Sequence, residues 1–316
     1  QTLREEMTRD ERVVVMGEDV ANRESGGVYG ITAGLADEFG ELRVIDTPIT
    51  ESAIIGAAGG AALTGLRPVA ELMFIDFLGV CLDQLMNQIA KFRYMFGGRA
   101  TTPVTIRTMI GAGAGTGPQH SAILYPLLVA IPGIKVVAPS NAYDAKGLLA
   151  QAIRDDDPVV FCEHKAIYTE ECEVPDESYT IPFGQARTVC EGTDVTVVAF
   201  SRMVLLAGQA ANALAAEGIS VEVIDPRTLS PLDDEAILAS IRKTGRVVVV
   251  DESNPYCSMA SEVSSIVVEK GFDYLDAPIR KVTAPHTPVP ASPVLEKEYV
   301  PSVAEIESAI REVAAY

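Results

Sequence analysis

The stretch DTPITESAIIGAAGGAALTG, residues 46–65, determines how this chain is interpreted. Val44 and Ile45 before it predict a short strand, Pro48 turns the chain, and the run of Ala and Gly that follows is typical of a tightly packed helix. Glu51 therefore lies where a strand becomes a helix. Loops at the carboxyl ends of parallel strands are the usual ligand sites of α/β folds, which favours a chemical role for this carboxylate. The alternative is that Glu51 only complements the helix dipole.

Short apolar runs alternate with helical stretches on both sides of this segment. This alternation predicts an α/β fold with a parallel sheet covered by helices. The strands expected in the first half are 12–16, 42–45, 103–108, 135–138 and 158–162, and the helices expected there, besides the one after Glu51, are 76–96 and 144–154.

The polar, acidic and Pro-containing stretch 169–180 interrupts this pattern, and we interpret it as an interdomain linker. Beyond it the expected strands are 194–200, 220–224, 246–250 and 278–282, and the expected helices are 203–217 and 302–315. A chain of 316 residues is also too long for one typical core. We therefore expect two domains, residues 1–180 and residues 181–316, of which the second is a smaller α/β unit.

The composition narrows the classes of function. With 25 Lys and Arg against 44 Asp and Glu, the formal charge is −19, which argues against a nucleic-acid partner because phosphate binding needs clustered cations. A neutral or basic protein partner fits this charge better. No apolar run reaches the roughly 20 residues needed to cross a bilayer, and the start is no signal peptide. We expect no membrane partner, a bacterial cytoplasmic or organelle-matrix location, and further residues upstream of Gln1.

Nucleophile and imidazole candidates are few. The five cysteines are scattered without metal-ligand spacing and are expected to be reduced. Among three histidines, His120 follows the loop Gly111–Gly117, GAGAGTG, whose glycines allow a ligand or another chain to approach closely. It can serve there as a proton donor or charge stabiliser, or it can cap a helix that begins near Ser121. We interpret His164 as structural and His286 as a loop residue.

Several common catalytic motifs are missing. The glycine loop is not a dinucleotide fingerprint, and the chain contains no GxxxxGK[ST], HExxH, GxSxG or CxxC. The segment DPRTLSPLD, residues 225–233, is expected to end a strand and turn the chain. Asp225 and Arg227 within it are expected either to form an ordered ion pair or to meet a partner subunit.

Motifs along essentially the whole chain resemble one family. They are MGEDV at 16–20, DTPITE at 46–51, the Phe77 region, QHS at 119–121, PSNAYDAKGLL at 139–149, RDDDPV at 154–159 and DPRTLSPLD at 225–233. The chain resembles the beta subunit of the thiamine-diphosphate-dependent first component of 2-oxoacid dehydrogenase complexes. The segments ELMFIDF, KFRYMFGG, NPYCS and residues 276–296 look most like the acetoin dehydrogenase branch.

The resemblance implies a fold and three site residues. The fold is a pyrimidine-binding domain of the transketolase type followed by a transketolase-type C-terminal domain. Glu51 matches the carboxylate that hydrogen-bonds the pyrimidine ring of thiamine diphosphate and drives its amino-to-imino shift. Phe77 matches the aromatic ring that packs on the pyrimidine, although by itself it reads as an ordinary core Phe. His120 matches the histidine that assists acyl transfer to lipoamide.

The resemblance also implies partners. The GDG motif that holds Mg²⁺ and the diphosphate occurs nowhere in the chain, so both are expected on an alpha subunit in an alpha2-beta2 heterotetramer. The other expected partners are the small-molecule substrate and the lipoyl-bearing acyltransferase core. Ala152, Asp155 and Asp157 lie where such beta subunits often carry a structural potassium ion; the alternative is a charged helix end. The competing functions are a pyruvate or branched-chain 2-oxoacid dehydrogenase beta subunit and a non-catalytic scaffold, which would need none of the three site residues.

Overall fold

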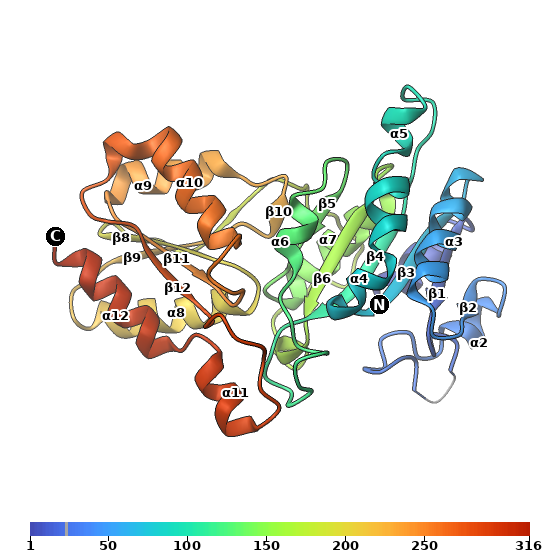
Figure 1. Cartoon of the computed structure of the whole chain (residues 1–316), viewed down its shortest axis with the longest axis horizontal. Helices are drawn as coiled ribbons and strands as arrows, with labels where there is room; N and C mark the ends of the chain where they lie inside the picture. The colour runs from blue at the N-terminus through green and yellow to red at the C-terminus, as the bar shows by residue number, and fades with distance from the viewer. Residues whose placement is uncertain (23–24) are drawn as a thin grey trace.

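The structure is a computed structural model that describes residues 1–22 and 25–316. The chain forms two sheets that lie side by side, each covered by helices (Figure 1). In the described residues the larger sheet has seven strands, in the order β10 (Thr228–Ser230), β5 (Lys135–Val137), β6 (Val159–His164), β4 (Thr105–Ile110), β3 (Arg67–Phe74), β1 (Val13–Gly17) and β2 (Val44–Asp46). Its pairs are parallel apart from β10 with β5. The expected α/β class is confirmed.

The smaller sheet belongs to the second half of the chain. Its described strands run in the order β12 (Arg280–Thr283), β11 (Val247–Asp251), β8 (Val195–Ala199), β9 (Val221–Asp225) and β7 (Arg187–Cys190). In β1, β8 and β11 every residue is buried. Strands of a parallel sheet with helices on both faces read as continuous Val-rich runs, which is why these three could be predicted from their apolar residues alone.

Helices cover both sheets. The first half contributes α1 (Thr2–Arg9), α2 (Leu35–Phe39), α3 (Glu51–Leu63), α4 (Leu78–Asp83), α5 (Phe92–Met95), α6 (Tyr125–Val129) and α7 (Ala142–Arg154). The second half contributes α8 (Arg202–Ala215), α9 (Asp234–Thr244), α10 (Met259–Gly271), α11 (Pro293–Tyr299) and α12 (Val303–Ala314). Side-chain caps define where several of them begin. Asn141 caps α7, and Ser302 with Glu305 forms a capping box on α12.

The helical spacing predicted over 76–96 corresponds to helical structure, but not to one regular α-helix. The segment divides into the 3-10 turn η1 (Ile75–Phe77), α4, the π-helical η2 (Gln84–Ile89) and α5. A π turn changes the phase of the side chains, and here Ile89 packs directly onto Gly59 of α3. A Cβ at Gly59 would lie 2.7 Å from Ile89, so the small-residue run of α3 allows this close approach.

Two strands of the larger sheet do not follow from local pattern. The long strand β3 begins with Arg67 and Pro68 and carries Glu71, which breaks its apolar run. Its burial depends on Arg107 of β4, which pairs with Glu71. Strand β10 has only three residues and comes from the second half of the chain. The predicted division between residues 180 and 181 stays a prediction, and β10 shows that the two halves share a sheet.

The described helices include none that is long and apolar enough to span a membrane.

Candidate active site

Three of the predicted site residues follow strands of the larger sheet. Glu51 follows β2, Phe77 ends the turn after β3, and His120 lies in the loop after β4. Because β2, β3 and β4 belong to the parallel part of one sheet, their carboxyl ends face the same way. The sheet topology therefore places these three residues at the edge where parallel α/β folds bind ligands.

Glu51 is the first residue of α3, and its side chain is buried, with 8% of the residue exposed. The described part of the chain gives its carboxylate no hydrogen bond or ion pair. The neighbouring Ser52 hydroxyl donates to the Val80 carbonyl at 2.6 Å, which ties the start of α3 to α4 beside Phe77. A buried carboxylate without a partner is costly, so this position fits a hydrogen-bond donor supplied by a ligand.

The charge of Glu51 affects two neighbouring groups. The pKa of the Cys81 thiol is raised to about 12, chiefly by burial and secondly by Glu51. Burial also raises the pKa of Glu18, and Glu51 and Asp19 add to that effect. Glu18, from the MGEDV motif, therefore lies within electrostatic reach of Glu51. In the sequence this motif contributed to the family resemblance, but it did not predict a place for Glu18 near Glu51.

Phe77 and His120 are in contact. Their ring centroids are 5.4 Å apart in an edge-to-face arrangement, and Phe74 lies 4.8 Å from the His120 ring and 6.1 Å from that of Phe77. Edge-to-face geometry is the favourable one for aromatic pairs. Phe74 was not predicted from the sequence, where it is indistinguishable from other apolar residues of β3. The predicted helix near Ser121 is wrong, because α6 begins at Tyr125 and His120 does not cap it.

The other two histidines lie where they were expected. His164 is buried: its Nδ1 accepts a hydrogen bond from the Ala166 N–H at 3.2 Å, and its Nε2 lies 2.9 Å from Glu252. Because Nδ1 accepts from Ala166, Nε2 is the nitrogen that donates to Glu252. His286 lies exposed in a bend, with its ring 4.8 Å from that of Tyr256.

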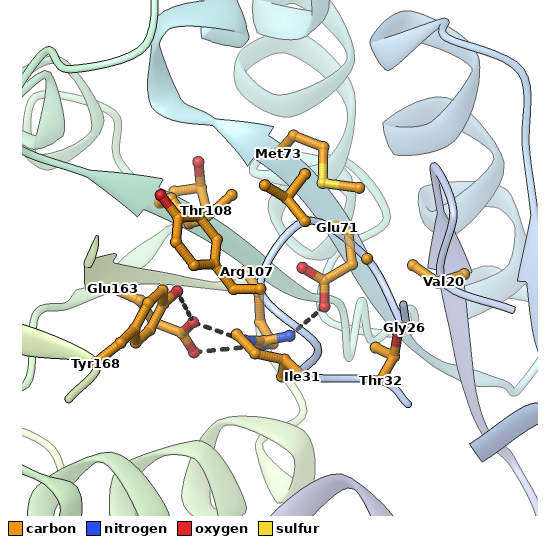
Figure 2. Close-up of a pocket in the computed structure, with 14 residues that line it drawn as sticks. Val20, Gly26, Ile31, Thr32, Glu71, Met73, Arg107, Thr108, Glu163 and Tyr168 are labelled. Carbon is orange, nitrogen blue, oxygen red and sulfur yellow. Dashed lines mark hydrogen bonds and ion pairs between the residues drawn. The ribbon is translucent and has the colours of Figure 1, made fainter. Parts of the chain in front are cut away.

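A small pocket is lined by residues of β3, β4 and β6 and by Tyr168 (Figure 2). Figure 2 shows Arg107 of β4 held between Glu71 of β3 and Glu163 of β6, with the Tyr168 hydroxyl donating to Glu163 at 2.7 Å. Burial opposes the charge of Arg107, but Glu163 and Glu71 outweigh it and raise the pKa of the guanidinium. Burial raises the pKa of Glu71, and the negative charge of Glu163 adds to this shift. The positive charge of Arg107 acts in the opposite direction but does not cancel it. The space of about 20 Å³ admits about one water molecule, which is too little for a substrate.

Sequence reasoning missed the Arg107 group. One signal was available, because Glu71, Arg107 and Glu163 are charged residues in strands whose other residues are buried. In the sheet Glu71 is directly opposite Arg107. Charges inside buried strands need partners on neighbouring strands, so such residues predict one another.

The residues proposed for potassium are already engaged. The Asp155 carboxylate binds Lys135 at 2.6 Å, and Asp157 pairs with Arg93 and, at 3.6 Å, with Lys135. The carbonyl of Asp155 accepts a hydrogen bond from Arg67 at 2.8 Å, and that of Ala152 accepts one from the Asp155 N–H. Across residues 1–22 and 25–316 no group of three His, Cys, Asp or Glu side chains could hold a metal ion. The potassium site stays a prediction, and it would have to rely on backbone oxygens.

Of the two roles expected for Asp225 and Arg227, the ion pair between them is wrong, and contact with a partner subunit stays a prediction. The Arg227 guanidinium pairs with Asp144 at 3.0 Å, and Asp225 accepts from the Ser140 hydroxyl at 2.5 Å and lies 3.6 Å from Arg187. Only the backbone N–H of Arg227 donates to Asp225, at 2.9 Å. Partners from α7 and β7 take the place of the local pairing, and Arg187 lies 3.6 Å from both Asp144 and Asp225.

Two family models match the chain. The model described as "Transketolase, pyrimidine binding domain" matches residues 1–170, and that described as "Transketolase, C-terminal domain" matches residues 184–306. A solved structure described as a split gene transketolase, an inactive beta4 tetramer, has a TM-score of 0.82 and 25% identity, covering 99% of this chain and 96% of that one.

Relatives match over nearly the full length. Proteins named acetoin:2,6-dichlorophenolindophenol oxidoreductase subunit beta are 54% identical in Bacillus subtilis (strain 168) and 55% identical in Cupriavidus necator, each covering 97% of this chain and 93% of the relative. A pyruvate dehydrogenase E1 component subunit beta from Rickettsia felis is 45% identical, covering 99% of this chain and 96% of the relative.

Proposed function

The chain belongs to the family of transketolase-type beta subunits of thiamine-diphosphate-dependent oxidoreductases, and from this premise we propose that it is the beta subunit of an acetoin dehydrogenase. In this proposal the assembled enzyme cleaves acetoin and transfers the acetyl unit to lipoamide. The buried carboxylate of Glu51, which has no partner in the described chain, is the observation that supports a cofactor-binding role. The names of the relatives that are 54% and 55% identical support acetoin as the substrate.

Each of the three residues has a defined task in this proposal. Thiamine diphosphate, when bound, supplies the nucleophilic carbon and the electron sink. Glu51 would hold the pyrimidine ring nitrogen by a hydrogen bond to its carboxylate, and this contact would favour loss of a proton from the amino group. The Phe77 ring would pack on the pyrimidine without competing for hydrogen bonds. His120, half-buried against Phe74 and Phe77, donates or holds a proton on the substrate side during transfer to lipoamide.

The alpha subunit completes the site. This chain lacks a GDG motif, and in the described residues no cluster of metal-binding side chains occurs. We therefore assign Mg²⁺ and the diphosphate to an alpha chain, with the pyrimidine side of the cofactor held by this one. A structural potassium ion at the backbone of Ala152, Asp155 and Asp157 remains part of the proposal.

Assembly gives a further expectation. The chain should form a two-fold beta pair with two alpha subunits, and its acidic surface should contact a basic element of the acyltransferase core. If that contact is electrostatic, binding to the core weakens as salt rises past physiological strength, because the Debye length there is only about 8 Å. Analytical ultracentrifugation with alpha and a salt titration of core binding check both points. A monomeric chain beside alpha, or binding that salt does not change, would contradict this arrangement.

Reconstitution with the alpha subunit tests the substrate. Turnover with acetoin, pyruvate and 3-methyl-2-oxobutanoate would be compared, with 2,6-dichlorophenolindophenol as electron acceptor. We expect acetoin to give the highest kcat/KM. A higher kcat/KM with pyruvate or with the branched acid would identify that compound as the substrate instead of acetoin. The name of the relative at 45% identity supports pyruvate as the alternative. No turnover with any of them would favour the scaffold alternative.

A further inference from the structure

The loop that carries His120 is held by residues of the second half of the chain. The Glu296 carboxylate, on α11, accepts hydrogen bonds from the backbone N–H groups of Gly113 at 2.8 Å and Gly115 at 3.0 Å. Glu252, at the end of β11, accepts one from the N–H of Ala112 at 2.7 Å. Figure 1 shows α11, just before α12 in the chain, beside the loop that follows β4. Two carboxylates thus bind three N–H groups of one loop.

Lys165 anchors the other end of the same loop. Its ammonium donates to the Thr116 hydroxyl at 2.9 Å, to the Ser121 hydroxyl at 3.2 Å and to the carbonyl of His120 itself. Burial lowers the pKa of Lys165, although Asp76, Glu296 and Glu252 act against that shift. The loop therefore lies between a buried cation that binds its oxygens and two buried anions that bind its nitrogens.

The backbone of the loop explains why a carboxylate fits there. Gly113 and Gly115 have positive φ angles of 106° and 65°, which turns their N–H groups toward one point. Such concave arrangements of N–H groups bind anions. Glu296 is 5% exposed on a helix whose other acidic residue, Glu298, is exposed. A buried carboxylate needs hydrogen bonds to offset its lost hydration, and the two loop N–H groups supply them.

We propose that Glu296 is a positioning residue that acts through His120. By fixing the loop Gly111–Gly117, it sets where the His120 ring lies against Phe74 and Phe77. The second half of the chain thereby governs a step assigned to the first half. The inference rests on the proposed role of His120 in acetyl transfer, and it names a residue that local sequence does not connect to that role.

The test uses the alpha–beta enzyme with the variants E296A, E296Q, H120A and the double variant E296A/H120A. Glu298→Ala is the matched control, because Glu298 lies on the same helix and is exposed. Two rates are measured: reduction of 2,6-dichlorophenolindophenol with acetoin, and acetyl transfer to a lipoylated domain. Hydrogen exchange of residues 111–120, followed by mass spectrometry on the same enzymes, reports the loop directly.

We expect E296A to slow acetyl transfer by on the order of 10-fold to 100-fold, because misplacement of about 1 Å is costly in a catalytic group. Dye reduction should fall less, and E298A should change neither rate. E296Q keeps one acceptor oxygen and should recover part of the loss. Residues that act as one unit are non-additive, so E296A/H120A should be no slower than H120A alone. Exchange in the loop should rise in E296A and in E296A/H120A, and it should stay unchanged in H120A and E298A.

Three outcomes would overturn the proposal. Unchanged exchange in E296A would mean that Glu296 does not hold the loop. Losses that multiply in the double variant would mean that Glu296 acts independently of His120. If E296A slows transfer while H120A does not, Glu296 acts through another group. Normal acetyl transfer in the single variant H120A would reject the proposed role of His120. Hydrogen exchange of residues 111–120 in E296A would still decide whether Glu296 anchors the loop.

Discussion

Single residues in this chain take their properties from burial and from partners distant in sequence. Glu51 begins a helix and is buried with no partner among the described residues, whereas the carboxylate of Asp225 is surrounded by Ser140, Arg187 and the N–H of Arg227. The first arrangement leaves a carboxylate available to a ligand. The second uses it to hold the turn after β9 against α7. Two substitutions separate these roles.

Glu51→Gln should abolish turnover in the assembled enzyme without preventing assembly. The amide keeps the shape of the side chain but cannot act as the charged acceptor, and general acid–base groups typically contribute about 10²–10⁴ in rate. Steady-state kinetics of the alpha–beta pair, with gel filtration to verify assembly, measure this effect. Activity near that of the wild type would mean that Glu51 only complements the dipole of α3.

Asp225 should make stability depend on pH in mild acid. Burial, with a contribution from Asp144, raises its pKa from 3.8 to about 6, against the effect of Ser140 and Arg187. The folded chain therefore binds this proton more tightly than the unfolded chain. The stabilisation is fully present below pH 4 and is lost as pH rises through 6. Its size is about 3 kcal/mol, since one pKa unit corresponds to about 1.4 kcal/mol.

Urea unfolding of the wild type and of Asp225→Asn between pH 4 and pH 7 measures this contribution. The difference in the free energy of unfolding, wild type minus variant, should fall as pH rises from 4 through 6. It should change little between the upper end of that transition and pH 7. Comparison with the variant removes the contributions of the other carboxylates, which both proteins share. A difference independent of pH would show that Asp225 stays charged in the folded chain.

The element that matters most for the site is the glycine loop after β4. Gly111 has a φ of 88°, and a Cβ placed there would lie 2.0 Å from Nε2 of His164. That imidazole binds Glu252, which in turn binds the N–H of Ala112. Burial pushes the pKa of Glu252 upward, but His164, the Ala112 N–H and Arg202 outweigh it and lower that pKa. The loop thus begins on a buried ionisable pair, and its first glycine cannot be replaced without moving that pair.

Gly111→Ala should lower the free energy of unfolding by about 2 to 4 kcal/mol, because it adds both left-handed backbone strain and overpacking. Gly208→Ala is the matched control. Gly208 lies within α8, and a Cβ there meets no atom within 4 Å, so its replacement should stabilise the chain by about 0.5 to 1 kcal/mol. Urea unfolding of both variants at one pH checks the contrast. Equal changes would mean that the loop can move away from His164.

At the scale of the whole molecule, the two sheets form one unit through shared parts. Strand β10 of the second half completes the larger sheet, and the hydroxyl of Tyr125 on α6 donates to Asp251 at the end of β11 at 2.5 Å. The described chain nevertheless offers only the pyrimidine side of the proposed site. Among residues 1–22 and 25–316 no group of three His, Cys, Asp or Glu side chains could hold the metal of the cofactor.

The isolated chain should therefore bind thiamine diphosphate and Mg²⁺ only weakly, with no useful affinity. Most of the charge of the cofactor is on its diphosphate, and without the metal and its ligands that charge stays unpaired. Isothermal titration calorimetry of the chain alone and of the alpha–beta pair measures the difference. Micromolar binding by the chain alone would contradict a site divided between two polypeptides.

Local pattern was sufficient for the Val-rich strands, for helix α3 with Glu51 at its start, and for the position of His120 in a glycine loop. These features depend on residues close in the chain, and the spacing of their apolar side chains indicates which of them are buried. It was insufficient for β3, for the divided segment 76–96 and for the partner of Arg227.

Those features, and the contact of Glu296 with Gly113 across 183 positions, depend on which elements the fold brings together. Without its partner, the charged Glu71 in a buried strand looks unfavourable. Without its partners, Glu296 on a short helix looks like an exposed acid. Burial of a charge is tolerated only with a partner, and that partner is supplied by tertiary packing rather than by sequence neighbours.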